Sequence, residues 1–123
     1  MAKLVFCEDE EKIQKLISFI LRSSPYEIYL ASDGLEGLAI IERERPNLIF
    51  ADVSMPHCDG FKMADRLKAK PELARIPLVF MTAFAQASDI EEGYRHGAIG
   101  YLVKPFGPID LREQIEVFLG SAA

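Results

Sequence analysis

Side chains that could bind a metal ion and a phosphate group stand directly after several short apolar segments. In chain order these residues are Glu8, Asp9, Asp52, Thr82 and Lys104. Carboxylates gathered at one place repel each other unless a cation joins them. Oxygen ligands from Asp9 and Asp52, with water and a backbone carbonyl, suit Mg²⁺, which binds through few carboxylates and keeps several waters. The residue types therefore predict a magnesium site.

The same residue types could support phosphoryl transfer. An aspartate can act as a covalent nucleophile toward phosphorus and form an acyl phosphate. The transferring phosphoryl group spreads charge over its oxygens, so catalysis consists mostly of positioning and neutralising that charge. Mg²⁺ would hold one oxygen, the Lys104 ammonium a second, and the Thr82 hydroxyl with the Ala83 backbone N–H a third. These residues favour capture of a phosphoryl group by a carboxylate.

Short β-rich apolar segments alternate with longer segments of helical period along the whole chain. The expected strands are 3–7, 26–30, 48–51, 78–81 and 99–103, and the expected helices are 13–21, 35–41, 61–67, 89–96 and 109–119. Strict alternation predicts an α/β fold with a parallel sheet covered on both faces. Ligands bind to such sheets outside the carboxyl ends of the strands. All the candidate residues follow strands, so we expect them at one edge.

Turn and cap residues mark where the helices should begin and end. Asp33 before Gly34 is typical of a helix start, and Asp59-Gly60 is typical of a turn and cap. Pro71 is expected to close the helix over 61–67. Gly97 stands where a C-terminal cap would lie after 89–96.

Length, charge and cysteine content limit the class of protein. A chain of 123 residues predicts one domain over 1–123, and a net charge of −5 without a basic run argues against direct nucleic-acid binding. No segment approaches the ~20 apolar residues of a membrane span. Cys7 and Cys58 are too few for a disulfide framework. We expect a cytoplasmic protein with reduced thiols and no membrane insertion.

Four motifs occur in order along nearly the whole chain. They are Glu8-Asp9-Glu10, the D-x-x-M-P-x-x-D-G segment from Asp52 to Gly60, Met81-Thr82-Ala83, and the segment from Gly100 to Phe106 with Lys104-Pro105. Together they resemble the acidic pair, phosphorylation loop, switch hydroxyl segment and last strand of receiver domains of two-component response regulators. The resemblance, to single-domain chemotaxis regulators in particular, implies a flavodoxin-like doubly wound (βα)5 fold with a five-stranded parallel sheet of order 2-1-3-4-5.

The resemblance also implies a role for each candidate residue. Asp52 takes a phosphoryl group from a phosphohistidine on a histidine kinase or a histidine phosphotransfer protein. Asp9 and Asp52 bind Mg²⁺, or Mn²⁺, with the backbone carbonyl of Ser54, and Glu8 acts through metal-bound water. The residues implied to bind the phosphoryl group are Thr82, Ala83 and Lys104.

A conformational switch is part of the same resemblance. Thr82 moves toward the attached phosphoryl group, Tyr101 turns inward, and the Lys104-Pro105 bond is cis. Phosphorylation favours a pre-existing state that alters the face formed by the fourth expected helix, the fifth strand and the fifth expected helix. The chain is then a signalling switch that catalyses only its own phosphoryl transfer and slow dephosphorylation. Its target is a downstream protein or an output domain missing from this sequence, and the positions of Met1 and the last helix favour a stand-alone receiver.

Three other functions remain alternatives. An aspartyl-nucleophile phosphatase commonly carries a second aspartate two residues after the nucleophile, where this chain has Ser54. A degenerate receiver that only binds partners would lack the acidic pair, the acceptor or the lysine. A flavin-binding electron carrier would need a phosphate-cradling loop rich in Ser, Thr and Gly after the first strand, where this chain has acids.

Position 84, two residues after Thr82, varies among receivers and is occupied here by Phe84. A large apolar side chain next to the acyl phosphate would exclude attacking water. We therefore hypothesise that Phe84 lengthens the lifetime of the phosphorylated state.

Overall fold

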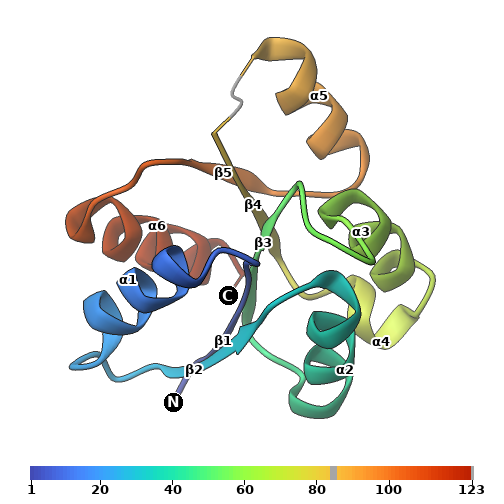
Figure 1. Ribbon diagram of the computed structural model, residues 1–123. Helices are drawn as coiled ribbons and strands as arrows, with labels where there is room; N and C mark the ends of the chain where they lie inside the picture. The colour runs from blue at the N-terminus through green and yellow to red at the C-terminus, as the bar shows by residue number, and fades with distance from the viewer. Residues whose placement is uncertain (84–85, 123) are drawn as a thin grey trace.

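The fold is a parallel sheet with helices on both faces (Figure 1), in a computed structural model that describes residues 1–83 and 86–122. In chain order its elements are β1 (Lys3–Cys7), α1 (Glu11–Leu21), β2 (Glu27–Ala31), α2 (Gly34–Glu44), β3 (Leu48–Asp52), α3 (Gly60–Lys68), α4 (Pro71–Ala74), β4 (Leu78–Thr82), α5 (Ala87–Arg95), β5 (Gly100–Val103) and α6 (Pro108–Ala122). The five strands pair in parallel in the order β2-β1-β3-β4-β5. The expected fold class and strand order are confirmed.

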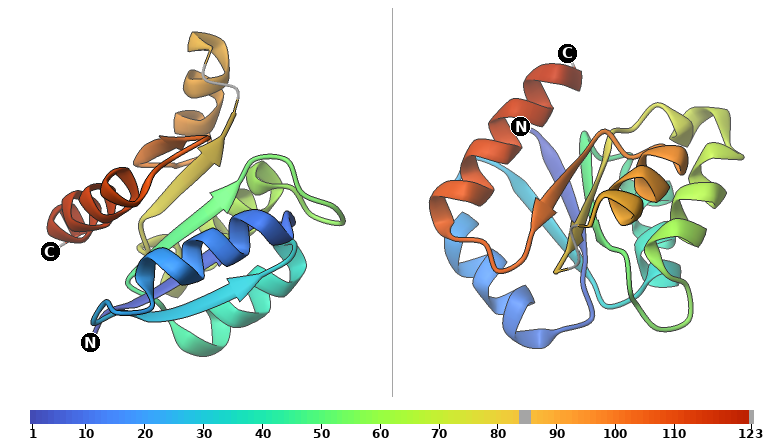
Figure 2. Two further views of the ribbon diagram at one scale, coloured as in Figure 1. Left: turned by 60° about the vertical axis from the view of Figure 1, so that its left-hand side comes forward. Right: turned by 90° about the horizontal axis from the view of Figure 1, so that it is seen from above.

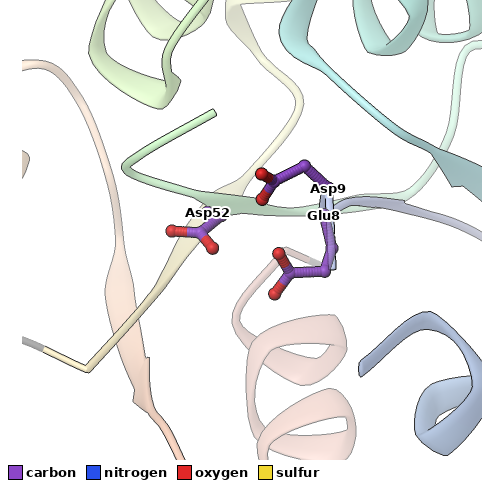
Figure 3. Close-up of side chains that lie close together, drawn as sticks. All are labelled: Glu8, Asp9 and Asp52. Atoms are coloured by element: carbon purple, nitrogen blue, oxygen red, sulfur yellow. The ribbon is translucent and has the colours of Figure 1, made fainter. Parts of the chain in front are cut away.

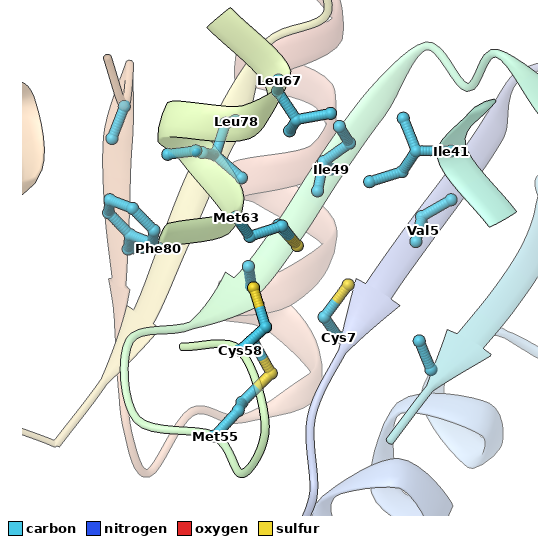
Figure 4. Close-up of a cluster of buried hydrophobic side chains, with 14 of the residues drawn as sticks. Val5, Cys7, Ile41, Ile49, Met55, Cys58, Met63, Leu67, Leu78 and Phe80 are labelled. Atoms are coloured by element: carbon cyan, nitrogen blue, oxygen red, sulfur yellow. The ribbon is translucent and has the colours of Figure 1, made fainter. Parts of the chain in front are cut away.

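Alternate residues of the central strands feed two separate cores. Leu4, Phe6, Leu48 and Phe50 pack with α1 and α6, and the Phe6 and Phe50 rings stack with centroids 4.9 Å apart. The intervening residues pack with α2, α3 and α4 on the opposite face (Figure 4). Side chains alternate across a strand with period two, so these uniformly apolar strands bury both faces. Figure 2 shows α1 and α6 on one side of the sheet and α2, α3, α4 and α5 on the other.

The described residues contain six helices rather than the five expected. The extra helix is the single turn α4, which begins at Pro71, the residue expected to close the preceding helix. Helix α3 ends at Lys68, three residues earlier. Proline has no N–H to donate and its fixed φ suits the first turn of a helix, so the same residue that cannot continue α3 can start α4.

The expected helix caps are confirmed by the geometry. The Asp33 carboxylate accepts a hydrogen bond from the Glu36 backbone N–H at 2.8 Å, and the Asp59 carboxylate accepts one from Lys62 at the same distance. Gly97 has a φ of 101°, which glycine adopts without the strain that a side chain would bring. Among the described residues, no helix is both long and apolar enough to cross a membrane.

Candidate functional site

The strands bring three acidic residues together at the carboxyl end of the sheet. Glu8 and Asp9 follow β1, and Asp52 is the last residue of the neighbouring strand β3. One carboxylate oxygen from each lies within 4.8 Å of the others (Figure 3). Glu8 is 0% exposed and Asp52 9% exposed, whereas Asp9 faces solvent. The structure thus confirms that the three carboxylates lie close together, as expected.

Lys104 contacts two members of this acidic cluster. Its ammonium nitrogen lies 2.5 Å from Asp52 Oδ2 and also forms an ion pair with Glu8 Oε1. The Lys104 backbone N–H donates to the Thr82 carbonyl at 2.9 Å, and the bond to Pro105 is cis, as expected. Burial lowers the pKa of Lys104, but its hydrogen bonds to Asp52 and Glu8 outweigh this and raise the pKa. Lys104 is therefore a fixed cation beside Asp52.

The burial of Glu8 disfavours the ionised form of its carboxyl group. Burial raises its pKa from 4.5 to about 7, and the negative charge of Asp52 adds to this effect. The hydrogen bond to Lys104 acts in the opposite direction and keeps the shift smaller than burial alone would make it. The repulsion between Glu8 and Asp52 is the property that a bound cation would relieve.

A pocket of about 550 Å³ opens over Asp52. Asp9, Ser54, Thr82, Ala83 and Lys104 all line it, so the structure brings the remaining expected phosphoryl-binding residues to the same place. The Ser54 backbone N–H donates to Asp52 Oδ1 at 3.1 Å and orients that carboxylate. Thr82 is 5% exposed at the end of β4. Phe84, the residue expected to shield this site, lies outside the described residues.

Tyr101 forms part of the wall of this pocket and is half-buried. Its hydroxyl donates to the Asp89 carbonyl of α5 at 2.8 Å, and its ring lies 5.9 Å from that of Phe80 and 5.6 Å from that of Tyr94. A Cβ atom on Gly93 would come within 1.6 Å of the Tyr101 hydroxyl. The ring therefore occupies a slot against α5 that the small size of Gly93 provides.

Close packing holds the loop that follows Asp52 against its neighbours. Gly60 donates its backbone N–H to the Val53 carbonyl at 2.9 Å, and a Cβ atom there would lie 2.5 Å from the Asp52 carbonyl oxygen. His57 has a φ of 66°, in the left-handed region that L-residues rarely adopt. The loop is short and folded back on itself, which keeps Ser54 next to Asp52.

Sequence reasoning missed two contributions to this site. One is the Glu8–Lys104 ion pair, because nothing in a linear sequence assigns Lys104 to two carboxylates at once. The other is Gln14, whose side-chain amide donates to the Glu8 carbonyl at 2.5 Å. Gln14 lies within the polar part of an ordinary amphipathic helix, and that pattern alone does not distinguish it from its exposed neighbours.

Known proteins of one family match this chain over almost its whole length. Residues 4–116 match the family model described as response regulator receiver domain. A probable transcriptional regulator, ycf27, from Cyanophora paradoxa is 35% identical over 117 residues, which cover 95% of this chain and 48% of that protein. The DNA-binding dual master transcriptional regulator RpaA from Synechocystis is 32% identical over 119 residues, 97% of this chain and 49% of that protein. The chain thus spans about half the length of these curated relatives.

Solved structures of similar size superpose closely on the fold. The chemotaxis protein CheY4 from Vibrio cholerae has a TM-score of 0.90 and 31% identity, with 96% of this chain and 98% of that chain covered. The receiver domain of the sensor histidine kinase PA1611 from Pseudomonas aeruginosa has a TM-score of 0.88 and 29% identity, with 97% and 98% covered. That receiver domain holds a magnesium ion coordinated in its active-site cleft.

Proposed function

Since the chain belongs to the family of response regulator receiver domains, we propose that Asp52 accepts a phosphoryl group in a Mg²⁺-dependent reaction that switches the domain. The position of Asp52 carries this proposal, because it belongs to the acidic cluster, contacts the Lys104 ammonium and lines the pocket, whereas Glu8 is fully buried. A simple structural ion pair would need only one carboxylate. Three acids at one edge of the sheet repel each other, which is a stability cost that a divalent cation would offset.

The donor set of the cluster fits magnesium. Asp9 and Asp52 offer hard carboxylate oxygens, the Ser54 carbonyl is a further candidate ligand, and Glu8 would accept a hydrogen bond from metal-bound water. When bound, the ion would neutralise charge on the acidic cluster and on the phosphoryl oxygens. This assignment is supported by the magnesium in the PA1611 receiver domain.

The residues of the chain would divide the transfer step as follows. One Asp52 oxygen forms a bond to phosphorus, and the bond from phosphorus to the imidazole nitrogen of the donor phosphohistidine breaks, with its electron pair staying on the imidazole. The Lys104 ammonium would move only a short distance from the Asp52 carboxylate to a phosphoryl oxygen, since it already contacts Asp52 Oδ2. Thr82 and the Ala83 N–H take another phosphoryl oxygen. Asp52, Thr82, Ala83 and Lys104 all line one pocket, which supports this division of roles.

Phosphorylation would be read out at the face formed by α5, β5 and α6, which are the fourth helix, fifth strand and fifth helix once the extra turn α4 is set aside. Thr82 ends β4, where it pairs with Val103 of β5, and it lines the same pocket as Tyr101. A movement of Thr82 toward the phosphoryl group would therefore change the space available to Tyr101. Tyr101 already contacts α5 through the Asp89 carbonyl. A change in its position would therefore alter how α5 packs.

The partners of this chain follow from the same chemistry. The phosphoryl donor would be a histidine kinase or a histidine phosphotransfer protein. The output would be a separate protein target or a domain joined to the receiver, as the lengths of the curated relatives suggest. The net charge of −5 gives the domain no attraction for a nucleic-acid backbone. The domain would not turn over an external substrate beyond its own phosphorylation and slow dephosphorylation.

Incubation with acetyl phosphate and Mg²⁺, followed by intact mass spectrometry, tests the proposal. We expect one phosphoryl adduct per chain, which disappears in Asp52→Asn and when EDTA replaces Mg²⁺. Asp59→Asn is a matched control in the same loop, because asparagine caps a helix as well as aspartate does. An adduct that survives Asp52→Asn, or that forms equally without a divalent ion, would contradict the proposal.

A further inference from the structure

The backbone around Glu8 is held from both sides by residues outside the acidic cluster. The Glu8 backbone N–H donates to the Ala31 carbonyl at 2.9 Å, and the Glu8 carbonyl accepts from the Gln14 side-chain amide at 2.5 Å. These two bonds fix the peptide planes before and after the Glu8 Cα atom. Because the plane after Glu8 also starts Asp9, the direction of both acidic side chains depends on them.

Gln14 reaches a second partner beyond the Glu8 carbonyl. The same amide nitrogen lies 3.3 Å from the Ser32 hydroxyl oxygen, in the turn that connects β2 to α2. Ala31 and Ser32 are adjacent in this turn. The acidic residues are therefore connected twice to one short segment, once by the backbone of Glu8 and once through Gln14.

The same segment also holds the loop that follows Asp52. The Gly34 backbone N–H donates to the Cys58 carbonyl at 3.1 Å, and a Cβ atom on Gly34 would come within 2.2 Å of that oxygen. Cys58 is 1% exposed, so the loop is packed firmly at this point. The position of Gly34 is set in turn by Asp33, which caps α2 through the Glu36 N–H.

From these contacts we propose that Gln14 and the turn at 31–34 form a positioning bracket, which sets the distance between the acidic residues and the Asp52 loop and so determines the affinity for Mg²⁺. Groups that orient metal ligands without touching the ion commonly change metal affinity by ~10–100-fold when they are removed. The bracket contains no metal ligand. It acts through the backbone of Glu8 and of Cys58, and the inference rests on the proposed metal site.

Substitution of Gln14 by methionine tests the first arm of the bracket. Methionine keeps the length of the side chain and cannot donate to the Glu8 carbonyl, so we expect the Kd for Mg²⁺, measured by calorimetric titration, to rise about tenfold. Amide hydrogen exchange should accelerate at residues 8–10 relative to the wild type, in the absence of any metal. Gln114→Met on α6 is the matched control, and it should change neither quantity.

Gly34→Ala tests the second arm. The added methyl group must push the Cys58 carbonyl away, so we expect weaker Mg²⁺ binding and faster exchange in the segment from Ser54 to Cys58. Gly100→Ala is the control, because its methyl group would meet the Phe118 ring on the far side of the sheet. It should lower thermal stability without changing the Mg²⁺ affinity of the folded protein.

The wild-type titration separates the two proposals. A wild-type protein that does not bind Mg²⁺ would overturn the proposed function and the bracket together. Normal binding by the wild type, with an unchanged Kd and unchanged exchange in Gln14→Met, would overturn the bracket alone. Gln14→Met introduces no steric clash, so this result does not depend on whether Gly34→Ala folds.

Discussion

The buried carboxyl group of Glu8 should make the metal-free protein less stable as the pH rises. Its pKa is raised from 4.5 to about 7 in the folded protein, chiefly by burial. Between these two values the folded state holds a proton that the unfolded state has lost. The unfolding free energy falls with pH wherever the folded state binds more protons, so stability is lost from about pH 4.5 to about pH 7.

The structure sets the size of this effect. The interval from 4.5 to about 7, at about 1.4 kcal/mol for each pH unit, gives an upper limit of roughly 3.5 kcal/mol. Lys104 forms an ion pair with the Glu8 carboxylate, and Asp52 lies beside it. Rearrangement of these neighbours when Glu8 ionises would reduce the loss of unfolding free energy. We therefore expect about 1–3 kcal/mol.

Urea unfolding at several pH values in EDTA, for the wild type and Glu8→Gln, measures the contribution of Glu8. The difference between the two proteins removes the contribution of every other titrating group. The wild type should lose stability relative to Glu8→Gln as the pH rises toward 7. Mg²⁺ added at pH 7, at ten times its Kd, should then stabilise the wild type by about 1.4 kcal/mol. If the unfolding free energies of the two proteins change in parallel with pH, the raised pKa of Glu8 is refuted as the cause of the stability loss.

Three further predictions follow from single contacts. Lys104→Met should reduce the rate of phosphorylation by acetyl phosphate at least tenfold, because the ammonium beside Asp52 is lost. An unchanged rate in a rapid-quench assay would show that Lys104 does not take part in the transfer. Hydrogen bonding to Asp65, and secondarily to Glu92, raises the pKa of His96 above 6.5. The wild type should therefore be more stable than His96→Asn below pH 6.5, and this advantage should disappear as the pH rises through the folded-state pKa. An NMR titration of the imidazole ring checks the direction of the pKa shift. Gly60→Ala should destabilise the protein by about 1–3 kcal/mol in chemical unfolding, because its methyl group would lie 2.5 Å from the Asp52 carbonyl oxygen. Gly107→Ala should cost far less, because its methyl group would lie 3.7 Å from an Asp110 carboxylate oxygen, an ordinary contact distance.

The elements of the fold could be read from local patterns because their causes are local. Apolar runs, helical periodicity and cap residues such as Asp33 and Gly97 act within a few positions of the chain. These patterns predicted the five strands and the helices between them. The single turn α4 was missed because Pro71 is compatible both with the end of one helix and with the start of the next. The strand order came from resemblance to a family rather than from any local pattern.

The residue types of the site were likewise available from the sequence, since the carboxyl ends of parallel strands must share one edge. The sequence by itself determined that acids, a hydroxyl and a lysine would meet there. Only the tertiary structure decided that Lys104 contacts Glu8 as well as Asp52, that Glu8 is buried, and that Gln14 joins the acidic residues to the turn before α2. These contacts join residues that are distant in the chain, and their geometry depends on the register of neighbouring strands and the path of the loops. Such distances are properties of packing, which no short stretch of sequence specifies.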